Sequence, residues 1–353
     1  GVLLNGVLAL MLFAGSLHVD LKELRARAWP VLILATAGVG LSTLLFGAGM
    51  FVLFPWFGIP VPFIWCLVLG AIVAPTDAVV VEGLLRRIPM PQQVRAIISG
   101  ESLFNDGAAI VFFLAGLAVA SGEQDVVGHG RLTLRILMEV AGGGLLGWAA
   151  GLVVVILARG LRDRSLELTL SLALALGVYR LGLAFGVSGP IAVVAAGLAY
   201  RNTHWPGKAQ ADQVAASWST IDDLLNTLLF VLMGFQILAV QPGREVFLAL
   251  PLIFVISLLS RGISVGATLA VMAIPVREKL RGAATLTWTG LRGGISIALA
   301  LTLPDTPYRE HLLAVSYIVV IMTIVIQGLT VPAVLRAVYR PATPPPPPRD
   351  TSG

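Results

Sequence analysis

The sequence predicts an all-α polytopic membrane protein, and its composition is the first observation that indicates this fold class. Hydrophobic residues make up 57% of the 353 positions, charged residues make up only 12%, and the mean hydropathy is +0.90. These values lie far outside the range of soluble globular domains. The apolar residues also gather in long runs that lack the alternating polarity of a membrane β-barrel. Helices must therefore satisfy the backbone hydrogen bonds inside the bilayer.

About eleven apolar runs are candidates for membrane spans, since a helix needs roughly 20 residues to cross the hydrocarbon core. No linker between them is long enough to separate two domains, so we expect one transmembrane domain over residues 1–340. Residues 341–353 are rich in proline and predict a disordered extension. In chain order we place the spans at 1–16, 29–55, 61–85, 92–120, 132–158, 166–185, 188–200, 217–240, 244–274, 279–303 and 311–339.

The distribution of basic residues predicts the orientation in the membrane. Of the 24 Lys and Arg, 17 lie in alternate loops and the tail, and three lie in the opposite loops. Cytoplasmic loops carry such an excess of basic residues, so we expect the cytoplasmic membrane as the location and a cytoplasmic C-terminal tail. The net charge of +5 then reflects topology and does not indicate a nucleic-acid partner. The loops predicted to be cytoplasmic are 17–28, 86–95, 159–165, 201–216 and 275–281.

Two of the predicted spans are interrupted near their middles. The segment "LGAIVAPTDAVVVEGLL" carries Pro-Thr-Asp at 75–77, where proline removes a backbone donor and frees carbonyl groups. The segment "TLTWTGLRGGISIALAL" carries glycines on both sides of Arg292. Interrupted segments in corresponding halves of a membrane protein indicate a transporter's binding site. The two lie third and tenth among the spans, each followed by a long closing run, and this layout predicts an inverted repeat.

Asp77 is the strongest candidate for a functional charge. A charged side chain in the middle of a span costs several kcal/mol, so intramembrane acids are functional by default. A carboxylate beside freed carbonyls can bind a dehydrated hard cation through oxygen. The alternative is that Asp77 caps the second half of the broken helix.

The stretch "GESLFNDGAAIVFF" places a polar cluster at the head of an apolar run. Helical spacing pairs Glu101 with Asn105 and Ser102 with Asp106 on adjacent faces. Close to Asp77, these carboxylates would repel one another when ionised and so hold a proton that a metal cation can displace. Competition between proton and cation for one site is an exchange mechanism. The alternative is that the cluster joins helices through Ser and Asn hydrogen bonds.

Arg292 needs a carboxylate partner, because a guanidinium group does not lose its proton in proteins. Glu101 is our first choice, since this ion pair would leave Asp77 and Asp106 free to titrate. Asp106 is the alternative partner, and sequence alone does not separate the two.

Other charges within the predicted spans are less specific. Asp222, Asp223 and Asn226 lie within about two turns of a span's start, and are as well suited to capping the helix or lining an entrance as to binding. For Arg180 and Arg261, pairing with one of these acids and a part in transport are equally open.

Taken together, these motifs resemble the monovalent cation/proton antiporters of the NhaP and sodium/hydrogen-exchanger type. The resemblance runs over nearly the whole chain, and the combination of the Pro-Thr-Asp break, the Glu-Ser-x-x-Asn-Asp cluster and the Gly-Leu-Arg-Gly-Gly span is highly specific. The segments that carry it are "LFAGSLHVDLKELR", "LGAIVAPTDAVVV", "ISGESLFNDGAAIVFF", "GVSGPIAVVAAGLAYRN", "LLFVLMGFQI" and "TWTGLRGGISIALAL".

The resemblance implies roles for particular residues. Asp77 is similar to the family's essential ion- and proton-binding carboxylate, and Thr76 supplies a backbone or hydroxyl oxygen. The pair Asn105 and Asp106 looks like the signature of the electroneutral branch, in which Asp106 binds the transported Na⁺ together with Asp77. Ser102 is a possible additional ligand.

The resemblance also implies an ion pair and an architecture. Glu101 and Arg292 match a structural ion pair of the family, in agreement with the pairing chosen on charge grounds. The family fold crosses its two interrupted helices in a core, contains about 13 spans and forms a homodimer through its other helices. About two N-terminal spans are therefore expected to be missing from this sequence.

The function implied is secondary active transport of Na⁺ or Li⁺ in exchange for H⁺, electroneutral, by alternating access, in the service of pH homeostasis. It needs no cofactor and is not an enzyme activity; the partners are the ions and membrane lipid. Exchange of K⁺ for H⁺ on the same scaffold is the nearest alternative. An intramembrane aspartyl hydrolase using Asp77 and Asp106 and a cation channel are more distant ones.

Overall fold

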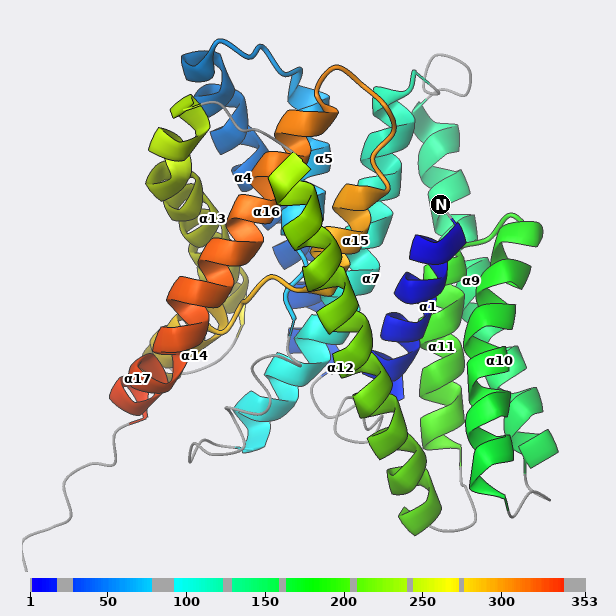
Figure 1. The fold of residues 1–353 in the computed structure, drawn as a ribbon. Coiled ribbons are helices and arrows are strands. Elements are labelled where there is room, and N and C mark those ends of the chain that lie inside the picture. The colour runs from blue at the N-terminus through cyan, green and yellow to red at the C-terminus, as the bar shows by residue number, and fades with distance from the viewer. Residues whose placement is uncertain are drawn as a thin grey trace, which may run out of the picture.

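The computed structural model describes residues 2–17, 28–77, 92–122, 129–158, 163–203, 208–239, 244–272 and 276–339. Within these ranges the regular structure is helical, as predicted (Figure 1). The elements are α1 (Val2–Leu17), α3 (Ala28–Ile33), η1 (Leu34–Gly38), α4 (Val39–Leu53), η2 (Phe54–Phe57), α5 (Phe63–Val73), α7 (Gln92–Ala120), α9 (His129–Ala158), α10 (Arg164–Ala184), α11 (Gly189–Asn202), α12 (Lys208–Ala239), α13 (Arg244–Val271), α14 (Val276–Trp288), α15 (Gly294–Leu301), α16 (Arg309–Met322), η3 (Thr323–Gly328) and α17 (Leu329–Val338).

In the part of the chain that the structure describes, most predicted spans coincide with helices, and the number of membrane crossings stays a prediction. The span predicted at 92–120 is α7, and five helices among the described residues are long and apolar enough to cross a membrane. Helix α12 begins at Lys208, earlier than the predicted start at residue 217. The added segment "KAQADQVAA" contains good helix formers and no breaker, so the helix extends beyond the apolar run. The proline-rich end, 341–353, lies outside the described residues, as does the second half of the first interrupted span.

The helices form two bundles that meet along a shared face (Figure 1). The unbroken bundle contains α1, α9, α10, α11 and α12, which pack against one another. The broken-helix bundle contains α3 to α5, α7 and α13 to α17. Contacts between the bundles join α1 to α7 and α15, and α12 to α15 and α16. Within the broken-helix bundle, α4, α5 and α7 form one set of helices, and α13 to α17 form the other. The first set is interrupted after α5 and the second between α14 and α15. An inverted repeat predicts such a layout.

Small residues let neighbouring helices approach closely. A Cβ atom on Gly147 of α9 would overlap the backbone of Ala192 of α11, and one on Gly151 would meet Ala196. Likewise, Gly70 of α5 lies against the backbone of Thr43 in α4. Membrane helices pack through such small residues because lipid supplies no hydrophobic force between them.

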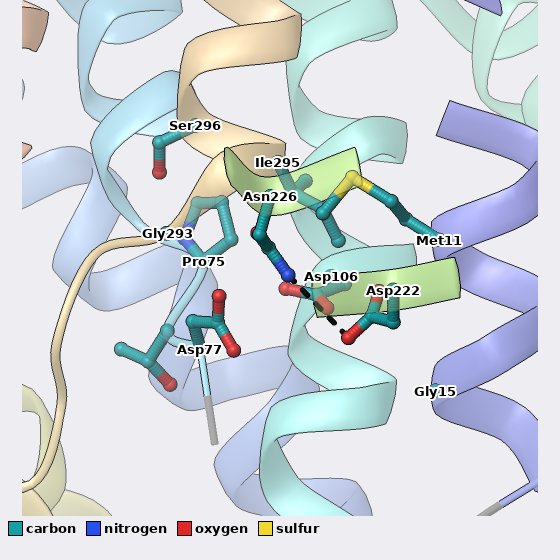
Figure 2. Close-up of a pocket in the computed structure, with 11 residues that line it drawn as sticks. Met11, Gly15, Pro75, Asp77, Asp106, Asp222, Asn226, Gly293, Ile295 and Ser296 are labelled. Carbon is teal, nitrogen blue, oxygen red and sulfur yellow. Dashed lines mark hydrogen bonds between the residues drawn. The ribbon is translucent and has the colours of Figure 1, made fainter. Parts of the chain in front are cut away.

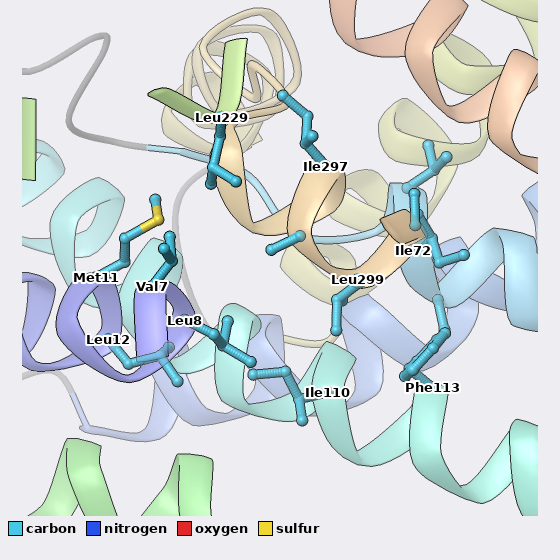
Figure 3. Close-up of a cluster of buried hydrophobic side chains, with 14 of the residues drawn as sticks. Val7, Leu8, Met11, Leu12, Ile72, Ile110, Phe113, Leu229, Ile297 and Leu299 are labelled. Carbon is cyan, nitrogen blue, oxygen red and sulfur yellow. The ribbon is translucent and has the colours of Figure 1, made fainter. Parts of the chain in front are cut away.

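An apolar layer lies where α1 meets the broken-helix bundle (Figure 3). Leu8 and Leu12 of α1, Ile110 and Phe113 of α7 and Leu299 of α15 all lie in one buried cluster. On α7, Ile110 and Phe113 follow Asp106 by one and two helical turns. The layer therefore covers the polar residues on the side of the C-terminal end of α7.

Candidate functional site

A cavity of about 40 Å³ lies between the two bundles. Both bundles contribute to its walls. Helices α1 and α12 lie on one side, and α7, α15 and the break that follows α5 lie on the other (Figure 2). Roughly 10–15 Å³ holds one water, so the cavity has room for a dehydrated cation and about one or two waters. The lining residues are Met11, Gly15, Pro75, Thr76, Asp77, Asp106, Asp222, Asn226, Gly293, Ile295 and Ser296.

The two interruptions cross each other beside the cavity. Helix α5 ends at Val73, because Pro75 two residues later offers no backbone donor and its ring crowds the preceding turn. The amide of Asp77 then donates to the carbonyl oxygen of Leu291, at 2.7 Å, in the break between α14 and α15. Gly293 packs directly on Asp77, and a Cβ atom there would overlap the Asp77 side chain.

Arg292 ties the second break to the first. Its side chain is 1% exposed, and its Nη1 donates to the carbonyl oxygens of Ala74 at 2.7 Å and Pro75 at 3.2 Å. These carbonyls follow the C-terminal end of α5, where the helix dipole is negative and a cation is favoured. The Arg292 amide also donates to Thr323 Oγ1 of η3, at 3.3 Å.

A buried ion pair between α13 and α7 supports the wall of the cavity that carries Thr76. Arg261 of α13 donates through Nη1 and Nη2 to the two carboxylate oxygens of Glu101, each at 2.9 Å. The amide nitrogen of Asn105 donates to Glu101 Oε1 at 3.1 Å and to Thr76 Oγ1 at 2.6 Å. The chain of contacts therefore runs from α13 through α7 to the break that carries Thr76 and Asp77.

The opposite wall carries a second acid and an amide. Asp222 and Asn226 of α12 are separated by one helical turn and lie on the same face, and both line the cavity. Asn226 Nδ2 donates to Asp222 Oδ2 at 3.4 Å (Figure 2). Asp223, the next residue along, is exposed.

The chemistry of the cavity is that of oxygen donors. Carboxylate, hydroxyl, amide and backbone oxygens are ligands for hard cations such as alkali and alkaline-earth ions. Among the described residues, however, no three His, Cys, Asp or Glu side chains are grouped closely enough to hold a metal ion by themselves. The carboxylates can therefore bind a cation only together with neutral oxygens or water.

A family model described as "Sodium/hydrogen exchanger, transmembrane" matches residues 1–337. The chain belongs to this family. Its members are transporters and not enzymes, and the polytopic helical fold of this exchanger-family chain is the fold expected of them.

Relatives of the chain are named as Na⁺/H⁺ antiporters. The chain is 39% identical to the Na(+)/H(+) antiporter NhaP of Pseudomonas aeruginosa, over 96% of this chain and 81% of that protein. It is 31% identical to the Na(+)/H(+) antiporter NhaG of Bacillus atrophaeus, over 95% of this chain and 63% of that protein. The solved structure of the sodium proton antiporter MjNhaP1 from Methanocaldococcus jannaschii superposes with a TM-score of 0.76, at 18% identity, covering 94% of this chain and 84% of that one.

The structure brings most of the predicted site residues of this family member together. Thr76, Asp77 and Asp106 line the cavity, whereas Ser102 and Asn105 are buried but do not belong to its lining. Asn105 instead orients the Thr76 hydroxyl by hydrogen bonding.

The predicted ion pair between Glu101 and Arg292 is wrong. Glu101 pairs with Arg261, and Arg292 donates to backbone carbonyls at the break after α5. Proline frees carbonyl oxygens at that break, and these neutral acceptors bind Nη1 of Arg292 in place of a carboxylate. Arg180, the other arginine left open, is exposed on α10.

Sequence reasoning left the opposite wall undecided. By sequence, Asp222 and Asn226 suit capping of the helix or lining of an entrance as well as ion binding. The structure places both residues against the cavity. Their spacing of four residues was the signal for a shared face, but nothing in the sequence shows which face of α12 points inward. Met11, Gly15 and Ser296 carried no signal of their own.

Proposed function

We propose that this protein exchanges Na⁺, and also Li⁺, for H⁺ across the cytoplasmic membrane by alternating access. One observation carries the proposal. Asp77 and Asp106 line a small oxygen-rich cavity at the crossing of two broken helices, between two bundles. The names of the antiporter relatives support Na⁺ and H⁺ as the ions.

The exchange rests on competition for the carboxylates. A cation that enters the cavity binds carboxylate oxygen of Asp77 and Asp106, and a proton leaves the carboxyl group to the same aqueous side. A neutralised site crosses the apolar barrier, while an ionised empty site does not, because an unpaired charge in the hydrocarbon region is costly. On the other side a proton replaces the cation and the cycle reverses. One cation then moves for one proton, which is electroneutral.

Neighbouring groups position the binding oxygens. Asn105 holds the Thr76 hydroxyl from α7, and the Asn105 amide is in turn held by Glu101. Glu101 is fixed by Arg261, so its charge is compensated and does not take part in ion exchange. Arg292 holds the carbonyl end of α5 in place, which keeps Thr76 and Asp77 at the cavity.

The alternatives are less well supported. Exchange of K⁺ is not favoured, since the named relatives are Na⁺/H⁺ antiporters. A channel does not need two broken helices that cross beside a cavity. An aspartyl hydrolase has no support from a family of transporters.

The assembly and orientation belong to the same proposal. We place the loops rich in Lys and Arg, together with residues 341–353, in the cytoplasm, in line with the charge distribution. The exposed apolar side chains on α9, such as Leu145 and Leu137, face lipid or a second copy of the chain in a homodimer. Exchange in this orientation serves pH homeostasis.

The deciding experiment is cation-driven proton movement in proteoliposomes that contain the purified protein, followed with a pH dye. We expect Na⁺ and Li⁺ to dissipate an imposed pH gradient through the wild type and through Asp305→Asn, a matched control at an exposed aspartate outside the site. We expect Asp77→Asn to be silent. Full exchange by Asp77→Asn would refute the competition mechanism, and cleavage of a peptide by the wild type would revive the hydrolase.

A further inference from the structure

Two buried oxygen atoms at the cavity have no hydrogen-bond partner among the residues that the structure describes. They are Oδ1 of Asn226, whose side chain is 8% exposed, and Oγ of Ser296, which is 1% exposed. Both residues line the cavity, from α12 and α15 respectively. Buried polar atoms are almost always paired in folded proteins, and each exception needs an explanation such as an ion or water.

The surroundings of Asn226 hold its oxygen at the cavity. Its nitrogen already donates to Asp222, which leaves Oδ1 as the free acceptor. On the far side, a Cβ atom on Gly294 would meet this oxygen at 2.5 Å, so the backbone of α15 closes against it. The side chain is therefore held between Asp222 and α15, and its oxygen remains an unused acceptor on a residue that lines the cavity.

The carboxylates need such additional ligands. No three acidic side chains converge on one point among the described residues, and a dehydrated hard cation prefers a shell of several oxygens. Neutral oxygens can complete the shell without adding charge that must be neutralised before the site crosses the membrane.

We propose that Asn226 Oδ1 and Ser296 Oγ are ligands of the transported cation, and that Asp222 orients Asn226 from the same face of α12. The inference rests on the proposed exchange function and extends it to a second wall of the site. The cation is then coordinated by both bundles, by α12 on one side and by the breaks and α15 on the other.

This division gives the neutral ligands a role in cation choice. Li⁺ is smaller than Na⁺ and accepts fewer oxygens, so loss of one neutral ligand weakens Na⁺ binding more than Li⁺ binding. A purely structural role for Asn226 and Ser296 would change both cations alike.

The test measures the apparent KM for Na⁺ and for Li⁺ in proteoliposomes for Asn226→Leu and Ser296→Ala. The matched controls are Thr227→Val, an exposed neighbour on α12, and Ser316→Ala, a buried serine of α16 that bonds to the Leu312 carbonyl. We expect about a tenfold rise in KM for Na⁺ in each site variant, a smaller rise for Li⁺, and unchanged values in the controls. A tenfold change corresponds to about 1.4 kcal/mol of binding free energy.

Thermal unfolding of the same proteins separates binding from folding. A ligand that binds the folded state raises its Tm, so Na⁺ should raise the Tm of the wild type and fail to do so in Asn226→Leu, while the Tm without Na⁺ stays near the wild-type value. If the site variants keep the wild-type KM for Na⁺, the proposed ligands are wrong while Na⁺/H⁺ exchange stands. If the wild type itself shows no cation-driven proton movement, the proposed function fails instead.

Discussion

Arg261 and Glu101 form a bidentate ion pair, and their side chains are only 3% and 2% exposed. Removing one partner of a buried pair leaves an uncompensated charge, which costs about 3–5 kcal/mol. We therefore expect Arg261→Leu to lower the free energy of unfolding by that amount. The measurement is denaturant or thermal unfolding of the purified protein in detergent.

The control for this variant is an ion pair at the surface. Arg135 and Glu139 lie one turn apart on α9, with side chains 59% and 33% exposed. Exposed pairs contribute about 0–1 kcal/mol, so Arg135→Leu should leave stability nearly unchanged. Equal losses in the two variants would show that burial does not set the contribution of the Arg261–Glu101 pair.

Gly293 lies so close to Asp77 that any side chain must displace the carboxylate. We expect Gly293→Ala to lose most cation-driven proton movement, because Asp77 moves away from the cavity. Gly177→Ala on α10 is the control, since nothing lies within 4 Å of a Cβ atom there, and Ala is a better helix former than Gly by about 0.5–1 kcal/mol. Normal exchange by Gly293→Ala would mean that Asp77 does not need its present position.

The sequence predicts Asp77 and Asp106 as site acids, and the structure places both at the cavity. The sequence does not predict the partners of the buried charges. Charge balance predicts that a buried Glu101 needs an arginine, yet Arg261 and Arg292 are equally suitable by charge, and only the packing of α13 brings Arg261 within reach. The same holds on α12, where Asp222 is buried and Asp223 is exposed. Successive residues on a helix point about 100° apart, and the apolar pattern around them is too uniform to show which faces inward.

The crossing of the two breaks depends on backbone hydrogen bonds as well as side chains. The Asp77 amide belongs to a non-helical segment but donates to Leu291, and Thr76 beside it is 2% exposed. We expect this amide to exchange its hydrogen slowly, unlike amides of an open loop. Hydrogen exchange followed by mass spectrometry measures the exchange rate of this amide on peptides that contain residue 77 close to their C-terminal end. Exchange within seconds would show that the crossing opens readily.

The helices were largely predictable, and their irregular turns were not. Long apolar runs and proline positions predicted α7, α9 and the break after α5, because these depend on local composition. The wide π-type turns η1 and η3 carry no such signal. In η3 the Thr323 hydroxyl accepts a hydrogen bond from the Arg292 amide. In η1 the Gly38 carbonyl accepts a hydrogen bond from the Ser264 hydroxyl. Contacts with other helices, and not the local sequence, accompany both turns.

In the proposed exchange, proton and cation compete for the one cavity between the two bundles throughout the transport cycle. As the pH falls, more of the site carboxylates are protonated, so more Na⁺ is needed to displace the proton. We expect the apparent KM for Na⁺ to rise as the pH is lowered and to level off at alkaline pH, with little change in the maximum rate. Initial rates at several fixed pH values, equal on both sides of the vesicle, provide the measurement.

A pH-independent KM would contradict competition for one site. Electroneutral exchange gives a second check on the same vesicles, because a one-for-one exchange carries no net charge. Clamping the membrane potential at different values should then leave the initial rate unchanged, and a strong dependence on potential would indicate unequal numbers of ions and protons.

The apolar layer formed by α1, α7 and α15 lies beyond the cavity toward the C-terminal end of α7 (Figure 3). From Asp106 to Phe113 the helix rises about 10 Å, and Leu8, Leu12, Ile110, Phe113 and Leu299 carry no side-chain group that can donate or accept a proton. A cell that maintains a proton gradient loses energy through every path that conducts protons without cargo. Because such an apolar layer hinders proton passage, we expect the proposed exchanger to remain in an energised membrane while idle without becoming a leak.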